Sequence, residues 1–320
     1  MSSPTPPWVL HMRQAADASA LIGGLPPANA LLRAAGPSLR LLQCHFTGTD
    51  WLERSAVPAG VHVCNATGQE VAIAEWVLGA MLRRVDGIKE NDATMRARCA
   101  EAAADGTDLG FAPPFFGAPP PPARTELSSC TVGIVGYGLI GSHVAERAAA
   151  FGCKVIATVG RATPPRRPPC LAWLGGGGEL HRLLREADFV VVACPLSDST
   201  RGLIGRAELA VMKPSAYLVN IARGPVVDEP ALFAALRDGA IGGAAIDVWY
   251  RLPAVAAGQR ECAPCDLIAH PFHTLPTVTL SPHTSGWSRA QVARRIAIMA
   301  ANLDAVARAR TPCNVVYRGV

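Results

Sequence analysis

The sequence predicts an α/β fold built around a doubly wound parallel sheet, and two observations lead to this prediction. From residue 127 to residue 281, short apolar runs rich in β-branched residues alternate with segments of helical periodicity, which is the order that places helices over both faces of a parallel sheet. The first of these runs is followed directly by a glycine-rich turn and a helix. A chain of 320 residues is long enough for two domains, each with its own core.

The composition is that of a folded globular protein, because 50% of the residues are hydrophobic and 17% are charged. The positive charges behind the formal net charge of +5 are dispersed, with Arg166-Arg167 the one tight pair in the middle of the chain, so we expect no nucleic-acid partner. No apolar run is long enough to span a membrane, and the first residues lack the pattern of a secretory signal. We therefore expect a soluble, cytoplasmic protein without a membrane partner.

The ten cysteines stand mostly among apolar residues, as reduced and buried thiols of intracellular proteins do. Cys262-Ala-Pro-Cys265 is the one CxxC pair, and it has no second pair at zinc spacing and opens no helix after a strand. We expect an ordinary loop there and no metal site.

The first part of the chain predicts a small α/β unit, in which Pro and Gly separate short apolar runs. Its longest helical pattern has apolar residues spaced for one wide buried stripe. The expected strands are residues 19–22, 39–44 and 61–64, and the expected helices are residues 28–35 and 70–84. Phe46-Thr-Gly-Thr-Asp50 follows the second strand as a turn whose backbone N–H groups could hold a small anion; an ordinary β–α turn is the alternative.

The pattern loosens after Arg84, and residues 113–122 are too rich in proline for a helix or a central strand. We expect a surface connection there, extended where the prolines run together.

The glycine-rich turn has the spacing of a dinucleotide-binding fingerprint. Residues 131–135 predict a buried strand, Gly136-Tyr-Gly138-Leu-Ile-Gly141 follows as GxGxxG, and residues 144–151 are helical with Gly152 as the stop. Gly136 permits the tight turn, Gly138 lets a pyrophosphate approach the backbone, and Gly141 lets helix and strand pack closely. The phosphates would lie at the positive end of the helix, so this context predicts a Rossmann nucleotide domain.

The remaining units continue the alternation of strands and helices. The expected strands are residues 155–159, 189–193, 216–221, 244–248 and 278–281, and the expected helices are residues 180–186, 206–212 and 229–238. A long helical pattern over residues 288–310 (Val292, Ile296, Met299, Leu303, Val306) lies past the end of that sheet, so we expect it to cross back and pack on the N-terminal segment.

Five stretches, read together, resemble the D-isomer-specific 2-hydroxyacid dehydrogenase family, the group with phosphoglycerate dehydrogenase, glyoxylate/hydroxypyruvate reductase and formate dehydrogenase. They are Gly136 to Gly141, Cys194-Pro-Leu-Ser-Asp-Ser-Thr-Arg-Gly-Leu-Ile204, Asn220-Ile-Ala-Arg-Gly-Pro-Val-Val-Asp-Glu-Pro-Ala-Leu232, Ala245-Ile-Asp-Val-Trp249 and Ser281-Pro-His-Thr-Ser-Gly-Trp287. The resemblance implies a second, smaller, flavodoxin-like α/β substrate domain formed by both chain ends. We assign residues 1–98 and 288–320 to it, residues 99–126 to the connection and residues 127–287 to the nucleotide domain.

The resemblance also implies an NAD(P)-dependent hydride transfer between nicotinamide C4 and C2 of a small 2-oxo or 2-hydroxy acid. In it, Arg223 would bind the substrate carboxylate, His283 would be the acid/base, and Glu75 would match an acidic residue of the first long helix. The loop expected to meet the carboxylate is Phe46, Thr47, Gly48 and Thr49. The expected cofactor contacts are Gly136, Tyr137, Gly138, Leu139, Ile140, Gly141, Arg161, Cys194, Pro195, Thr200, Ile221, Ala222, Arg223, Asp247 and His283, with Asp247 near the carboxamide.

One position departs from the family pattern. The family usually has a glutamate just before a proline, and here Leu252 stands before Pro253. That glutamate normally pairs with the histidine and raises its pKa. Either His283 is protonated only at lower pH, or Glu261 or Asp266 replaces the missing carboxylate, or activity is lost.

The expected cofactor is NADP or NAD. NAD enzymes place a carboxylate at the end of the second strand, whereas this chain has Arg161 and then Arg166-Arg167, which favours NADP and its 2′-phosphate. We expect a homodimer, as is usual in the family. The alternative function is a weakly active or inactive dinucleotide-sensing regulator resembling C-terminal-binding-protein corepressors, which Leu252 favours and the presence of both Arg223 and His283 disfavours.

Overall fold

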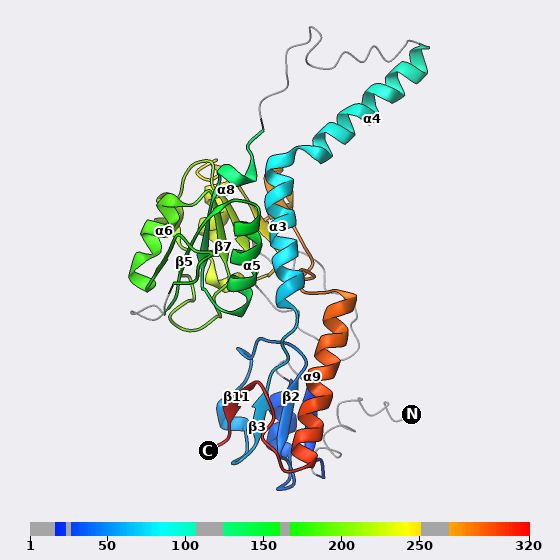
Figure 1. The fold of residues 1–320 in the computed structure, drawn as a ribbon, viewed down its shortest axis with the longest axis vertical. Coiled ribbons are helices and arrows are strands. Elements are labelled where there is room, and N and C mark those ends of the chain that lie inside the picture. Colours follow the sequence, from blue (N-terminus) through cyan, green and yellow to red (C-terminus); the bar gives the residue numbers. More distant parts are fainter. Residues whose placement is uncertain (1–16, 24–26, 107–123, 161–166, 251–268) are drawn as a thin grey trace.

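The computed structural model describes residues 17–23, 27–106, 124–160, 167–250 and 269–320. They form two sheets joined by long helices (Figure 1). The predicted α/β fold is confirmed, with a larger parallel sheet and a smaller sheet to which both ends of the described chain contribute.

The larger sheet has seven parallel strands in the order β10-β9-β8-β7-β4-β5-β6. Chain order reverses between β4 and β7, which is where an open sheet of this kind leaves a crevice at its carboxyl edge. The strands are β4 (Thr131–Val135), β5 (Lys154–Thr158), β6 (Trp173–Gly175), β7 (Phe189–Val192), β8 (Tyr217–Asn220), β9 (Gly243–Ile246) and β10 (Val278–Leu280).

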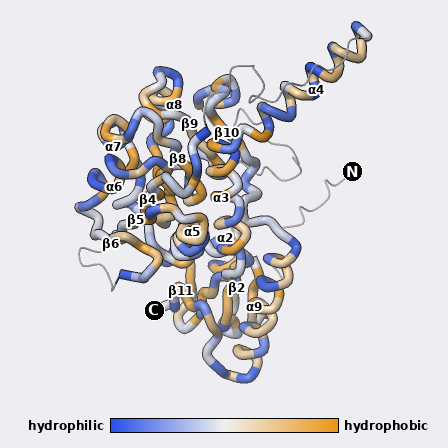
Figure 2. Tube along the Cα trace, turned by 45° about the horizontal axis from the view of Figure 1, so that its top comes forward, coloured by the Kyte–Doolittle hydropathy of each residue, from blue (hydrophilic) through white to orange (hydrophobic). Residues whose placement is uncertain are grey.

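Helices cover both faces of this sheet. On one face the core includes side chains of three helices, and on the other face it includes α5 (Leu139–Ala150) and α3 (Glu70–Asp86). The three helices of the first face are α6 (Leu180–Glu186), α7 (Arg206–Ala210) and α8 (Glu229–Arg237). In Figure 2 the hydrophobic colour recurs on the strands of the larger sheet and on the helices beside them, in line with these two cores. The doubly wound arrangement predicted from the sequence is therefore present.

The smaller sheet has the order β1-β2-β3-β11, and β11 pairs with β3 antiparallel. Its core gathers around Leu32, Leu42 and Val63, which are at most 1% exposed. The strands are β1 (Ala20–Gly23), β2 (Leu41–Cys44), β3 (His62–Cys64) and β11 (Val315–Arg318), with α2 (Pro27–Ala34) and α9 (Arg289–Ala307) as the helices. The C-terminal strand β11 completes the sheet begun by the N-terminal strands.

Helix α9 does return to the N-terminal segment, as predicted, but polar residues hold it there. Asn302 Nδ2 donates to Gln43 Oε1 (2.7 Å) on β2, and Cys313 N donates to Asn302 Oδ1 (2.8 Å). Gln291 and Asn302 are its buried residues, whereas Ile296, part of the predicted apolar stripe, is 56% exposed. The apolar spacing identified the helix correctly but not the face that packs.

One α-helix and two strands of the described structure were not predicted from the sequence. Helix α4 (Ile88–Asp105) follows α3 after Gly87, and its backbone projects away from the rest of the molecule (Figure 1). Hydrophilic residues recur along its length (Figure 2), so no apolar stripe reveals it. Strands β6 and β11 are short edge strands, for which periodicity carries little signal.

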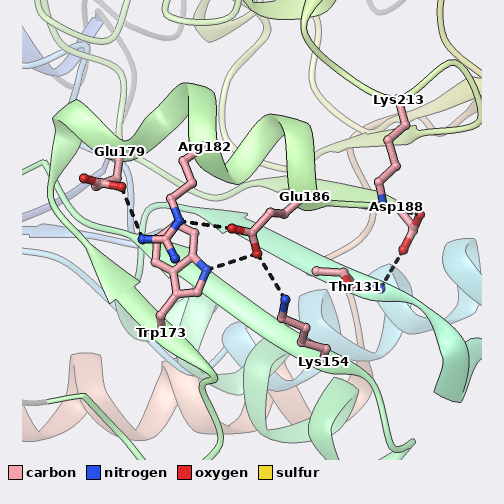
Figure 3. A network of polar contacts seen from close by, with 8 residues as sticks. All are labelled: Thr131, Lys154, Trp173, Glu179, Arg182, Glu186, Asp188 and Lys213. Carbon is pink, nitrogen blue, oxygen red and sulfur yellow. Dashed lines mark hydrogen bonds and ion pairs between the residues drawn. The ribbon is translucent and has the colours of Figure 1, made fainter.

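An ion-pair network joins the amino ends of several strands of the larger sheet (Figure 3). Glu186 accepts from Lys154 Nζ (3.1 Å) and Arg182 Nε (3.0 Å), and Arg182 lies over the Trp173 ring at 4.6 Å. Separately, Asp188 accepts from Thr131 N and from Lys213 Nζ, each at 2.8 Å. Thr131, Lys154 and Trp173 begin strands, and Asp188 directly precedes β7. Arg182 and Glu186 lie on α6, so these contacts tie that helix to the sheet at the edge opposite the crevice.

The described cysteines are free thiols, and five of them are buried: Cys44, Cys64, Cys130, Cys153 and Cys194. Burial raises the pKa of Cys44, Cys153 and Cys194 to about 11, so they remain neutral thiols. Cys262 and Cys265 lie outside the described residues. Within the described residues, no helix is long and apolar enough to cross a membrane.

Candidate active site

The glycine turn lies at the carboxyl end of β4, beside the point where the strand order reverses. Gly136 has φ +102°, and a β-carbon there would stand 2.6 Å from Cys194 N. A β-carbon at Gly141 would overlap with the carbonyl oxygen of Gly136. A β-carbon at Gly138, in contrast, would meet nothing within 4 Å. The first and third glycines thus permit close packing, and the second borders open space.

Helix α5 begins at Leu139, directly after this turn. The N–H groups of a helix's first turn have no partner inside the helix and favour an anion. Leu139 is 50% exposed, so the start of the helix is open to solvent. The Tyr137 side chain turns away to Cys170, with its hydroxyl 3.7 Å from Sγ, and burial raises the pKa of Tyr137 to about 12. Open space beside Gly138 and a free helix start together fit a dinucleotide pyrophosphate.

The loop after β7 closes the other side of the crevice. Cys194 is buried against Gly136, and Pro195 is exposed. Thr200 Oγ1 donates to Pro195 O (2.7 Å) and accepts from Ser197 N (2.8 Å). The Thr200 side chain therefore shapes this loop, whose backbone lines the crevice.

The expected substrate loop and Arg223 come together, although they are far apart in the sequence. Arg223 follows Ile221 and Ala222 at the carboxyl end of β8, and the loop follows β2. A β-carbon on Gly48 would overlap with Nη2 of Arg223. The backbone N–H groups of Thr47, Gly48 and Thr49 donate to no described residue. A guanidinium beside free N–H groups forms a binding site for a carboxylate.

Asp50, at the end of the same loop, holds the guanidinium. Its Oδ1 accepts from Arg223 Nη2 (2.9 Å) and Nε (3.1 Å), and its Oδ2 lies 3.3 Å from Nε. Asp50 belongs to the turn predicted from the sequence, but no role was predicted for its side chain. The signal that could have found it is its position, since an acid directly after an expected anion-binding loop needs a cationic partner.

His283 lies near Arg223 and Asp50, and both affect its ionisation. Its backbone is in the left-handed region (φ +60°), a conformation that costs a non-glycine residue roughly 1–2 kcal/mol. His283 as a whole residue is exposed, and no described residue hydrogen-bonds to its ring. The surrounding protein desolvates the imidazole and lowers the pKa of His283; Asp247 and Asp50 oppose this effect, and Arg223 adds to it.

Asp247 fastens the loop that carries His283. Its Oδ1 accepts from Ser281 Oγ (2.6 Å) and Thr284 N (2.8 Å), and Oδ2 accepts from Ser285 N (3.2 Å) and from the Ser285 hydroxyl. The Asp247 side chain is 1% exposed. Both carboxylate oxygens are thus engaged by residues 281–285, so this aspartate holds the loop in place rather than projecting freely into the crevice.

Several expected site residues lie outside the described residues, namely Arg161, Leu252, Glu261 and Asp266. Of the arginine pair, Arg167 is described, and its Nη1 donates to Leu171 O. Glu75 lies on the exposed side of α3. No group of metal-binding side chains occurs in the described part of the chain.

The arrangement supplies three chemical elements at one edge of the larger sheet. The glycine turn fits a dinucleotide, Arg223 with the loop of residues 46–49 fits a carboxylate, and His283 can give or take a proton. A hydride transfer to a carbonyl next to a carboxylate needs these three elements.

Comparisons with known proteins agree with this chemistry. Residues 115–285 match the family model described as "D-isomer specific 2-hydroxyacid dehydrogenase, NAD binding domain". A glyoxylate reductase of Korarchaeum cryptofilum is 31% identical over 309 residues, covering 95% of this chain and 84% of the relative. A glyoxylate reductase of Aeropyrum pernix is 40% identical over 197 residues, which is 61% of this chain and about half (54%) of the relative.

A solved 2-hydroxyacid dehydrogenase of Ketogulonicigenium vulgare has a similar fold. It superposes with a TM-score of 0.74 at 25% sequence identity, covering 98% of this chain and 89% of the other. The similarity therefore extends over both sheets and not only over the nucleotide-binding one.

Proposed function

Because the chain belongs to the D-isomer-specific 2-hydroxyacid dehydrogenase family, we propose that it reduces a small 2-oxo acid to the 2-hydroxy acid with a nicotinamide dinucleotide. The proposal rests most on one observation: the Arg223 guanidinium lies against the Gly48 backbone, with His283 close enough for its ionisation to depend on Arg223. The glyoxylate reductases among the relatives make glyoxylate the first substrate to test.

In the proposed reaction, Arg223 and the N–H groups of Thr47 to Thr49 bind the substrate carboxylate. The guanidinium also draws electron density from the adjacent carbonyl. The reduced nicotinamide, when bound, supplies the hydride. Protonated His283 donates its proton to the carbonyl oxygen and takes it back in the reverse direction. Asp247 keeps the histidine loop in place throughout.

We propose NADP as the preferred dinucleotide, since the chain places Arg161, and no nearby acid, after the second strand of the nucleotide-binding unit. Comparing the Michaelis constants for NADPH and NADH tests this choice. A clear preference for NADH would refute it without affecting the proposed reaction.

We also propose a cytoplasmic homodimer, and that residues 1–98 with 288–320 act as the substrate domain and residues 127–287 as the nucleotide domain, joined through residues 99–126. Helix α3, however, contributes to the core of the larger sheet. Helix α3 therefore packs on the proposed nucleotide domain, although its residues belong to the segment assigned to the substrate domain.

The test is a turnover assay with glyoxylate, hydroxypyruvate, pyruvate and 3-phosphohydroxypyruvate, each with NADPH and NADH. We expect reduction of at least one of these acids. Sedimentation with and without nucleotide is run beside it. Nucleotide-driven dimerisation without turnover of any acid would contradict the proposal and favour the dinucleotide-sensing regulator instead.

A further inference from the structure

The Arg223 guanidinium already has a carboxylate partner in the protein. Asp50 bonds to Nε and Nη2, the side of the guanidinium, at 2.9–3.3 Å. The two residues come from different sheets, since Asp50 follows β2 and Arg223 follows β8. Their side chains are 28% and 32% exposed, so water reaches the pair. A substrate carboxylate must therefore either share the guanidinium with Asp50 or displace it.

Counting the N–H groups distinguishes these two possibilities. A guanidinium has five N–H groups in one plane. Nε and one hydrogen of Nη2 serve Asp50, and one hydrogen of Nη1 serves Ala222 O at 2.8 Å. Among the described residues, one hydrogen on Nη1 and one on Nη2 have no acceptor, and these two can point together from the end of the guanidinium. A carboxylate can accept both at once.

We propose that Asp50 is a positioning residue, which fixes Arg223 side-on so that its free end receives the substrate carboxylate beside the backbone of residues 47–49. This inference rests on the proposed function. The hydrogen bonds of Arg223 to Asp50 and to Ala222 O restrict the rotation of this long side chain before substrate binds. Less conformational entropy is therefore lost on binding.

Asp50 also acts on the electrostatics of the proton donor. Arg223, Asp50 and Asp247 are the charged groups that affect His283, where Arg223 lowers the pKa and the two aspartates raise it. By pairing with Arg223, Asp50 offsets part of the arginine's effect on the imidazole. Removal of the Asp50 charge should therefore make His283 harder to protonate.

The test compares Asp50→Ala and Asp50→Asn with the wild type, and uses Asp238→Asn as the matched control. Asp238 makes a similar pair with Arg237 (2.7 Å) on the exposed surface away from the site. The readouts are the kinetic constants for the 2-oxo acid that the turnover assay identifies as best, the equilibrium binding of oxamate to the complex with NADPH, and the pH profile. Thermal unfolding and NADPH binding show that each variant is folded.

For Asp50→Ala we expect the Michaelis constant and the oxamate dissociation constant each to rise about tenfold or more, as for loss of hydrogen bonds to a charged group. As pH rises, the rate of reduction should begin to fall at a lower pH in this variant than in the wild type. Asp50→Asn keeps one acceptor oxygen, so its constants should lie between those of the wild type and those of Asp50→Ala. NADPH binding should not change, and Asp238→Asn should behave as the wild type.

Tighter oxamate binding in Asp50→Ala would overturn the inference, because it would mean that Asp50 competes with substrate for the same N–H groups. Unchanged binding and an unchanged pH profile in both variants would overturn it as well. If the wild type reduces no 2-oxo acid with either dinucleotide, the proposed function fails; wild-type turnover with unaltered variants contradicts only the role of Asp50.

Discussion

The backbone of Gly48 lies directly against the guanidinium of Arg223, so that no side chain fits between them. Gly48 lies in the loop after β2, and Arg223 lies in the loop after β8, 175 residues further along the chain. The two sheets are thus brought together at the proposed carboxylate site.

Gly48→Ala should reduce activity and leave the fold intact. The added methyl group overlaps with the end of Arg223, which must move aside and weaken its bonds to the partly exposed Asp50, so the unfolding free energy should fall by about 1 kcal/mol. The displaced guanidinium should lower kcat/KM for the 2-oxo acid about tenfold or more. Gly178→Ala, where a β-carbon meets nothing within 4 Å, is the control in both measurements.

Arg223→Lys should lose much of the activity although the positive charge is retained. Lysine keeps the positive charge but lacks the planar fork that can serve Asp50 and substrate together. We expect kcat/KM to fall by roughly 10²-fold, mainly through the Michaelis constant. Steady-state kinetics measure this loss, and Arg237→Lys on the exposed surface should show none.

The pH dependence of reduction should follow His283. In the proposed reaction, reduction needs the protonated imidazole, and the protein lowers the pKa of His283 from its ordinary 6.5. The value of kcat/KM for reduction should therefore be highest at low pH and fall as pH rises through a pKa below 6.5, while the reverse oxidation gains activity over the same range. A limb well above neutral pH would contradict this and point to a carboxylate partner for His283.

Asp247→Asn should destabilise the protein and impair catalysis together. The amide nitrogen of asparagine would face N–H and O–H donors of residues 281–285 that now bond to the carboxylate. We expect a loss of about 2–4 kcal/mol in the unfolding free energy, measured by urea denaturation. Ser285→Ala removes one of these donors and should cost about 1 kcal/mol; equal losses in the two variants would contradict the conclusion that Asp247 fastens residues 281–285.

Much of the larger sheet could be predicted from the sequence because its buried parallel strands appear as continuous apolar runs. Thr131–Val135 and Leu180–Glu186 have the predicted bounds. The exposed helix α4 could not be predicted, since its sequence carries no apolar stripe. For α9, spacing identified the helix, but the packing through Asn302 and Gln43 depends on a strand far away in the chain.

The site was predictable where a motif fixes the backbone and not where side chains meet across the fold. The glycine turn was recognisable because Gly136 and Gly141 have no room for a side chain. The pairing of Asp50 with Arg223 and the five contacts of Asp247 with residues 281–285 depend on loops from separate strands, so no local pattern announces them.

The most direct test of the proposed reaction is single-turnover oxidation of bound NADPH by glyoxylate in the wild type and in His283→Gln. The proposed role of His283 predicts that the wild type oxidises NADPH and that the variant does so about 10²- to 10⁴-fold more slowly, with unchanged NADPH affinity. Equal rates in the two proteins, or no oxidation by a wild type that binds NADPH, would contradict it.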